Sequence, residues 1–517
     1  RDALMTSLGA EAGLDVQNYR PAVLYLNGDY WGIYNIREKT SEHFVEDHHN
    51  VDPDTIDLIE GYGSANHGSG GHYSSMRSFI GSRDLTDPDV YAQVEDRYLD
   101  LRNFMDYHFA VVFGQNFDIG NIKCWRSETT NGGRFRWILY DQDYSFGLWE
   151  PDVYEPAMSR DYSDYRNMLE FKTAGSGTGN GWPNAGGRTL LFRRMLINEQ
   201  FRSGFILRAS DLLNTIFRED HMVERIDELA GTIRPEMERH LKRWSWPALV
   251  ERGHGEPFKE EDEPLTPAMW EQNVRDLVQF ARSRPDILRS EMQAFFELDG
   301  GLGDLSVSVI GEGRVRINSV VPEQYPWSGI YFSDLSSQIE GLPEPGYRLA
   351  SWSGPVVDPE NRGAAVNVVK GNRIEVVATF ERIPIENAAN EAVAISEIHY
   401  HPSPGMDSGD WFELHNGGEV AVELEGWEMR DEENDHVFVF PAHRLEPDEY
   451  LVVCQTVEAF SDIHPGVGAV LGGFGFSLGN GKDRIRLLSP NGALVRDIAY
   501  DDEAPWPIEA DGGGPSL

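Results

Sequence analysis

The sequence has little lysine, little cysteine and no long apolar run. Lysine stands at only seven positions among 45 basic residues, so arginine carries most of the positive charge. The two cysteines, Cys124 and Cys454, lie in different predicted domains, which excludes a disulfide framework and a cysteine-based structural zinc site. We interpret each as a small buried apolar residue. No stretch is apolar enough to span a bilayer, so the sequence predicts no transmembrane segment.

Acidic residues dominate the charge. The formal net charge is -41, which argues against nucleic acid as a partner because phosphate backbones would be repelled. An acid-rich, lysine-poor composition suits a saline exterior, but a GC-rich genome gives the same bias, so both explanations stay open. The length of 517 residues predicts two to four domains, and a mean hydropathy of -0.45 is typical of a soluble globular protein.

The stretch 111–148 holds the most chemically informative residues. Its sequence, VVFGQNFDIGNIKCWRSETTNGGRFRWILYDQDYSFGL, predicts the end of a helix, a polar turn, a short strand, a hairpin tip and a second strand. Polar side chains stand in the turn and at the exit of the second strand: Asn116, Asp118, Asn121, Asp141 and Asp143. Carboxylate and carboxamide oxygens are hard ligands that suit Mg²⁺ or Mn²⁺, and a metal so held suits phosphate chemistry.

The order of these residues is more informative than the D-x-D motif alone, which a solvated turn would also produce. The preceding N-x-D-x-x-N supplies a second half for a site. In protein kinases a catalytic-loop Asp and Asn precede a hairpin that leads to a metal-binding Asp at a strand exit. The order here is the same, although the sequence contains no H-R-D or D-F-G string.

Several segments of the first three hundred residues resemble the spore-coat protein H (CotH) kinase family. They are LYLNGDYWGIYNIREKTSEHF (24–44), the N-x-D-x-x-N turn, WILYDQDYSFG (137–147) and LLFRRMLINEQFRSGFILR (190–208). The resemblance implies a secreted atypical protein kinase fold that transfers phosphate from ATP to Ser or Thr of a protein acceptor. Family members carry an earlier segment, so we expect a fragment open at both ends and an extracellular or cell-surface location.

The resemblance and the residue order together assign roles in the polar stretch. Asp118 is the expected catalytic-loop carboxylate, which orients the acceptor hydroxyl, and Asn121 is an expected metal ligand. Asp141 is the expected principal metal ligand. Asp143 is a second ligand or a group that orients the first, and the order of Asp141 and Asp143 stays open.

The nucleotide end of the predicted site is less clear. Glu38 and Lys39 follow a predicted strand and are candidates for the pair that holds the ATP phosphates, although a solvated strand end is the simpler explanation. Kinase-like family members place a lysine at about the position of Glu60, and a carboxylate cannot neutralise phosphate oxygens. Lys39 or an arginine would then have to substitute. The glycine-rich stretch 61–73 lacks the spaced G-x-G-x-x-G motif, and we predict a plain flexible loop.

The rest of the chain predicts helices and then β-structure. Ranges 74–80, 89–113 and 189–296 have helical spacing, with a polar glycine-rich segment at 159–187 and a Pro- and acid-rich interruption at 244–267. From about Leu298 the strands alternate like a small β-repeat module of bacterial surface proteins. From Glu391 the motifs resemble the lamin-tail domain, an immunoglobulin-like β-sandwich. Within it, Glu397 and Glu413 are candidate Ca²⁺ ligands.

We therefore predict a multidomain α+β protein. It comprises an atypical protein-kinase-like domain at 1–298, a small β-repeat module at 299–383 and a lamin-tail-like sandwich at 384–517. The leading hypothesis is a metal-dependent kinase whose β modules contact a cell-surface or matrix component. The second is a degenerate kinase fold that serves as an extracellular scaffold, which Glu60 favours. The third is another metal-dependent enzyme that uses D-x-D, such as a phosphatase or a glycosyltransferase.

Overall fold

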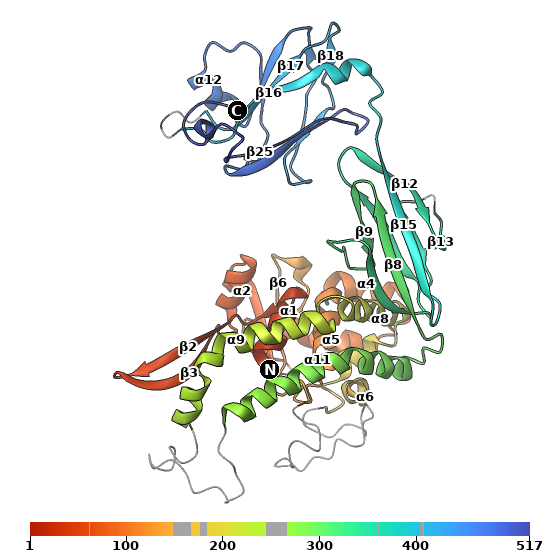
Figure 1. The fold of residues 1–517 in the computed structure, drawn as a ribbon. Coiled ribbons are helices and arrows are strands. Elements are labelled where there is room, and N and C mark those ends of the chain that lie inside the picture. The colour runs from red at the N-terminus through yellow and green to blue at the C-terminus, as the bar shows by residue number, and fades with distance from the viewer. Residues whose placement is uncertain are drawn as a thin grey trace, which may run out of the picture. The chain divides into compact units, whose positions relative to one another are not determined.

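The computed structural model describes residues 1–61, 63–147, 167–175, 184–244, 266–359, 361–403, 405 and 408–517 (Figure 1). Most of the predicted segments 159–187 and 244–267 lie outside the described residues. The chain forms two compact units. The first comprises Arg1–Leu305, Ser328–Ser337 and Asn367–Arg373, and the second comprises Ser306–Trp327, Gln338–Val366 and Ile374–Leu517.

A five-stranded sheet lies among the helices of the first unit. Its order is β1 (Asp15–Val16), β7 (Arg136–Leu139), β6 (Lys123–Ser127), β4 (Ile56–Glu60) and β5 (Ser64–His67). Strand β1 runs parallel to β7, and the other neighbours are antiparallel. The helices are α1 (Asp2–Glu11), α2 (Glu42–His49), α3 (Gly71–Ser82), α4 (Pro88–Arg97), α5 (Leu101–Gly114), α6 (Met168–Thr173), α7 (Leu190–Met195), α8 (Glu199–Leu213), α9 (Glu219–Trp244) and α11 (Pro267–Phe296). None of the helices described is long and apolar enough to cross a membrane.

Helix α5 runs through the core of this unit, and its caps explain its bounds. The Asp100 carboxylate accepts from the backbone N–H of Asn103 at 3.1 Å, which fixes the first turn. Gln115 ends the helix in the left-handed region with φ 53°. The prediction of one helix at 89–113 was wrong, because the Asp100 cap starts a new helix there and leaves α4 separate.

The glycine-rich stretch after β4 is more ordered than predicted. It contributes β5, which pairs antiparallel with β4, and the first turn of α3. The backbone N–H of Ser69 donates to the Asp57 carboxylate at 2.7 Å, which ties the stretch back to β4. A plain flexible loop was therefore the wrong prediction for its described residues, 61 and 63–73.

A long hairpin formed by β2 (Tyr19–Leu26) and β3 (Asp29–Arg37) turns at Asn27-Gly28, a residue pair that favours two-residue hairpin turns. Both turn residues have positive φ, 51° and 87°, which this residue pair tolerates well. The end of α9 holds the hairpin: His240 accepts from the backbone N–H of Ile33 at 3.0 Å, and the Arg239 guanidinium lies 3.8 Å from the centre of the Tyr30 ring.

The β-module begins with β8 (Leu302–Ile310), and part of it belongs to the first unit. Within that unit, Tyr331 donates its hydroxyl to the Asp211 carboxylate at 2.9 Å, and Asn214 donates to the Ile330 carbonyl at 2.9 Å. The remaining module strands are β9 (Gly313–Ile317), β10 (Trp327–Phe332), β11 (Ser337–Pro343), β12 (Tyr347–Ser353), β13 (Val356–Val357), β14 (Gly363–Val366) and β15 (Arg373–Arg382). In the second unit β12 pairs antiparallel with β15, and β13, β14, β11 and β9 follow one another in a second sheet.

The C-terminal part of the second unit is the predicted β-sandwich. One sheet has the order β16 (Val393–His399), β17 (Trp411–Asn416), β22 (Tyr450–Cys454), β23 (Val470–Gly472), and the other has β20 (Val437–Val439), β19 (Glu428–Arg430), β24 (Lys482–Leu488), β25 (Leu494–Asp501). Strands β18 (Val422–Glu423) and β21 (Arg444–Leu445) form a small ribbon, and α12 (Val457–Ile463) follows β22. Phe412 and Leu414 of the first sheet join Met429 and Leu487 of the second in one buried cluster. The multidomain α+β prediction is confirmed.

Candidate functional site

Three of the predicted site residues meet between the end of α5 and the exit of β7. The amide nitrogen Nδ2 of Asn121 donates to Asp118 Oδ2 at 3.1 Å and to Asp141 Oδ2 at 2.7 Å. Asp141 adopts the left-handed backbone conformation with φ 57°, which turns the chain sharply as it leaves the strand. The structure therefore brings the N-x-D-x-x-N turn and the strand-exit aspartate together.

Asn116 joins the two halves of this arrangement, and its side chain is only 1% exposed. Its Oδ1 accepts from the backbone N–H of Asp118 at 2.9 Å. Its Nδ2 donates to the Asp141 carbonyl at 3.3 Å and to Gln142 Oε1 at 3.1 Å. The sequence placed Asn116 in the turn but did not reveal this bridging contact, because the partner backbone comes from a segment 25 residues away.

The site carries more negative charge than its surroundings compensate. Burial, and then the charge of Asp143, raise the pKa of Asp118. Burial, followed by the charges of Asp143 and Asp118, likewise raises the pKa of Asp141. Asp118 Oδ1 is buried without a hydrogen-bond partner in the described structure. Asp143 itself is exposed.

These donors fit a hard divalent cation. Two carboxylates and the amide of Asn121 surround one point, and a metal would supply the missing positive charge and a partner for Asp118. The described residues contain no group of three or more His, Cys, Asp or Glu side chains that could hold a metal. Such a small set of ligands would suit Mg²⁺ better than ions that need a full protein shell, because Mg²⁺ is bound through one or two carboxylates while it keeps several waters.

Glu38 and Lys39 do not form the predicted pair in the structure. The Glu38 carboxylate accepts from the backbone N–H of Asn18 at 2.8 Å and pairs with His48 at 3.1 Å. Lys39 is exposed beside it.

Lys123, the first residue of β6, contacts the ring of Tyr140, the residue before Asp141. It is the direct antiparallel partner of Glu60, so both side chains project from the same face. Its Nζ donates to Thr40 Oγ1 at 2.8 Å and lies 5.2 Å from the centre of the Tyr140 ring. Among the described residues no carboxylate forms an ion pair with Lys123.

Tyr140 connects Lys123 and Glu60 to the acidic cluster. Burial, and then the charges of Glu60, Asp141 and Asp118 in that order, raise the pKa of its hydroxyl. The Tyr140 hydroxyl therefore interacts electrostatically with Glu60 of β4 and with Asp118 and Asp141 of the candidate metal site. The unpaired cation of Lys123 therefore lies at the margin of the same polar region.

Arg284 of α11 binds the C-terminal end of α5 through hydrogen bonds to backbone carbonyls. Its side chain is 1% exposed, and it donates to the Phe113 carbonyl at 2.9 Å and the Val112 carbonyl at 3.0 Å. Glu291 pairs with the same guanidinium at 2.9 Å. A cation at the last carbonyls of a helix is favourable because these groups lack intrahelical partners and carry the negative end of the dipole.

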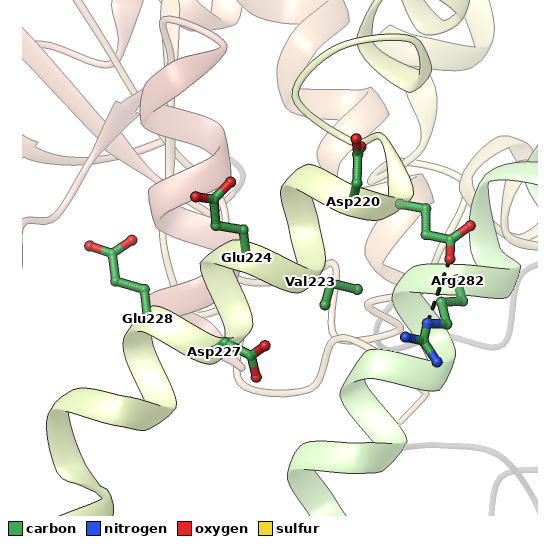
Figure 2. Close-up of a pocket in the computed structure, with 7 residues that line it drawn as sticks. Asp220, Val223, Glu224, Asp227, Glu228 and Arg282 are labelled. Carbon is green, nitrogen blue, oxygen red and sulfur yellow. Dashed lines mark ion pairs between the residues drawn. The ribbon is translucent and has the colours of Figure 1, made fainter.

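A separate hollow of about 630 Å³ lies between α9 and α11 (Figure 2). It is lined by Glu219, Asp220, Val223, Glu224, Asp227, Glu228 and Arg282. Its cation is already engaged, since Arg282 pairs with Glu219 at 3.5 Å. Acidic walls repel phosphate, and none of the lining residues belongs to the polar turn, so this hollow does not suit a nucleotide.

The protein thus combines a helical unit, which carries an acidic helix–strand junction, with a C-terminal β-sandwich. The family model described as CotH kinase protein matches residues 1–288, and the Lamin Tail Domain model matches residues 386–502. Because the first match covers more than half of the chain, the protein belongs to the CotH kinase family. Its C-terminal sandwich matches the lamin-tail domain.

Other comparisons add little. A search of curated proteins finds no match. A solved structure of a DUF4876 family protein from Bacteroides thetaiotaomicron is similar at 14% sequence identity over 30% of this chain and 48% of that chain, with a TM-score of 0.12. The chain thus spans about half the length of that protein. So low a structural score carries no argument about fold or function.

Proposed function

We propose that this protein is a metal-dependent atypical kinase that transfers the γ-phosphoryl group of ATP to a Ser or Thr hydroxyl of a protein acceptor. The observation that carries the proposal is the convergence of Asp118, Asn121 and Asp141, with two pKa values raised and one carboxylate oxygen that has no partner among the described residues. Membership of the CotH kinase family supports it. We also propose a secreted or surface location and a role for the β modules in partner contact.

Asp141 and Asn121 would hold Mg²⁺ or Mn²⁺, with the exposed Asp143 beside them. The bound metal would neutralise phosphate charge during transfer. Rotation of the Asn121 amide, whose nitrogen now faces both carboxylates, would present its oxygen to the ion.

Asp118 would act on the acceptor. Its unpartnered Oδ1 is free to accept the hydrogen bond of the attacking hydroxyl. As the hydroxyl oxygen bonds to the γ-phosphorus, the bond from that phosphorus to the bridging oxygen breaks, ADP leaves and the hydroxyl proton passes to Asp118. Because burial raises the pKa of Asp118, the carboxylate is a stronger base than an exposed aspartate.

Lys123 would contact the phosphates in place of Lys39. It has no carboxylate partner among the described residues, it projects from the same sheet face as Glu60, and it lies over Tyr140 next to Asp141. Lys39 is exposed on the segment after β3, where its neighbour Glu38 already pairs with His48. A cation opposite Glu60 would offset the carboxylate that the β4 strand presents.

The alternative is a catalytically degenerate kinase fold that serves as an extracellular binding module. Glu60 is the observation that favours it, because this carboxylate stands within electrostatic reach of Tyr140 and so adds negative charge at the margin of the site. The two functions differ in whether the chain binds ATP at all.

The test uses the full chain with γ-labelled ATP, Mg²⁺ or Mn²⁺, and a serine-rich acceptor. The control variants are Asp141→Ala, which removes a predicted metal ligand, and Asp276→Asn, an exposed change on α11. We expect label transfer by the wild type and Asp276→Asn proteins and none by Asp141→Ala. Absence of transfer together with absence of metal-dependent ATP binding by calorimetry would refute the kinase proposal in favour of the binding module.

A further inference from the structure

A pocket in the lamin-tail sandwich, far along the chain from the polar turn, has unusual charge. It encloses about 380 Å³ on the outer face of the β16–β17–β22 sheet, beneath α12. Its lining includes Glu397, His399, Trp411, Glu413, Phe460 and His464. A volume of this size accommodates one side chain or a small ligand.

The strand register places two carboxylates directly opposite each other in this pocket. Glu397 of β16 is the Cα partner of Glu413 of β17, and on the other side Glu413 faces Val452 of β22. Like charges directly opposite each other destabilise a sheet. No described Lys, Arg or His forms an ion pair with either one. Each accepts a serine hydroxyl, Glu397 from Ser516 at 3.0 Å and Glu413 from Ser396 at 2.8 Å.

The next register position on the same face of the sheet adds two buried polar side chains. His399 lies opposite Trp411, and their rings stack with centroids 5.2 Å apart. The two side chains are 6% and 8% exposed, and both line the pocket. In the described structure neither His399 Nδ1 nor Trp411 Nε1 has a hydrogen-bond partner. A buried polar atom left in this state costs about 1–3 kcal/mol, so an absent partner is indicated.

The chemistry of these groups selects the ligand. Burial lowers the pKa of His399, so its ring is neutral near neutral pH and one of its nitrogens is an acceptor. Two carboxylates and one imidazole nitrogen make three acceptors, which match the three N–H donors of a primary ammonium group. Trp411, Phe460, Val452 and Ile463 give the pocket apolar walls for a methylene stem. An anion would be repelled.

A metal ion fits less well. The sequence singled out Glu397 and Glu413 as candidate Ca²⁺ ligands, but Ca²⁺ takes six to eight oxygen ligands. The part of the chain that the structure describes has no cluster of three or more His, Cys, Asp or Glu suited to a metal. The indole N–H of Trp411 has no acceptor among the described residues. A bound metal cation would not accept its hydrogen bond, whereas a peptide carbonyl would.

We propose that this pocket binds a lysine side chain of a partner protein, with the ammonium group between Glu397, Glu413 and His399 and the lysine stem against Trp411 and Phe460. The Trp411 indole then donates to a carbonyl of the segment that carries the lysine. This inference is independent of the kinase proposal, since it rests on the sandwich alone.

The experiment is saturation-transfer NMR on the full chain with Nα-acetyl-lysine N-methylamide as the probe. We expect saturable binding that weakens tenfold or more in Glu397→Gln and in Glu413→Gln, and not in Glu419→Gln, an exposed control in the same domain. Val467, which is 43% exposed and lines the pocket, gives a blocking variant, Val467→Trp, that leaves both carboxylates in place and is expected to abolish binding.

Three further probes separate the alternatives. The same probe acetylated on its side-chain nitrogen has no charge, and equal binding of it would overturn the proposal. Tighter binding of Ca²⁺, with no signal from the lysine probe, would do so as well. Equal binding of n-butylamine would show that a free amine suffices and would overturn the assignment to a protein segment. Circular dichroism of each variant establishes that a lost signal is not lost folding.

Discussion

Replacing Asp141 with asparagine separates the cost of burying this negative charge from its contribution to metal binding. Without metal, burial and the charges of Asp143 and Asp118 raise its pKa, so the ionised form is disfavoured in the folded state. A carboxylate whose folded pKa is raised stabilises the fold at low pH, and this contribution is lost as the pH rises through the folded pKa. At neutral pH, Asp141→Asn removes that penalty. We expect the free energy of unfolding without metal to rise by up to about 1 kcal/mol, the scale of half-exposed charge pairs.

When metal is bound, we expect the wild type to be more stable than Asp141→Asn. An ion that binds only the folded state at one hundred times its dissociation constant adds about 2.7 kcal/mol to the free energy of unfolding. For a unit of this size that corresponds to a rise of about 5 °C in the unfolding midpoint. The wild-type protein is expected to show the full rise on addition of Mg²⁺ or Mn²⁺. Asp141→Asn, which replaces one of two carboxylate ligands, is expected to lose most of it.

The assay is thermal unfolding in EDTA and in excess metal, for the wild type, Asp141→Asn and the control Asp276→Asn. The Asp276 carboxylate is exposed and accepts from Gln272 at 2.8 Å, a bond that asparagine can keep. We expect Asp141→Asn to have the higher unfolding midpoint in EDTA and the wild type to have the higher midpoint in excess metal. An equal metal-dependent rise in Asp141→Asn would refute the assignment of Asp141 as a metal ligand. A variant clearly less stable in EDTA would refute the charge argument.

Three other predictions concern cationic side chains of the first unit. Lys123→Met should weaken ATP binding about tenfold in calorimetry, the value of one charge-assisted hydrogen bond, whereas Lys39→Met should not. Burial lowers the pKa of Lys172 to about 7, so the unfolded state binds more protons above that pH. Stability to urea should then rise between about pH 7 and 10, by at most about 1.4 kcal/mol per pH unit, and this rise should vanish in Lys172→Met. Arg284→Met should cost about 3–5 kcal/mol in urea unfolding because it leaves a half-buried Glu291 and two helix carbonyls unpaired, and adding Glu291→Leu should recover part of the loss.

Features that depend on neighbouring residues were predictable from the sequence. The Asn27-Gly28 turn fixed the β2–β3 hairpin because this pair accepts positive φ at low cost. The order of the polar turn and the strand-exit aspartate also anticipated their meeting. It holds because α5 packs on β7, where the Asn103 amide donates to the Trp137 carbonyl at 3.1 Å. The turn after α5 and the exit of β7 therefore end at the same place.

Features that depend on strand register or distant helices were not predictable. Glu38 and Lys39 are adjacent in sequence, yet Glu38 pairs with His48 while Lys39 is exposed. Glu60 and Lys123 are far apart in sequence, yet antiparallel pairing makes them direct neighbours. Arg284 reaches the end of α5 from 171 residues away, and no local pattern marks that contact. Residue type indicates which side chains are able to do chemistry, and register decides which of them meet.

The charge of the chain bears on both proposals. A net charge of -41 repels free ATP, so in the proposed kinase a metal that neutralises part of the phosphate charge and a cation such as Lys123 would both assist nucleotide binding. The same field attracts basic proteins, and the paired carboxylates of Glu397 and Glu413 supply a local site for one lysine. A lysine-rich acceptor would therefore be attracted by the net negative charge and would also offer a lysine to the Glu397–Glu413 pocket. An acidic acceptor would be repelled and would offer no such lysine. If the kinase proposal holds, lowering the ionic strength should slow phosphate transfer to an acidic acceptor and speed transfer to a basic one.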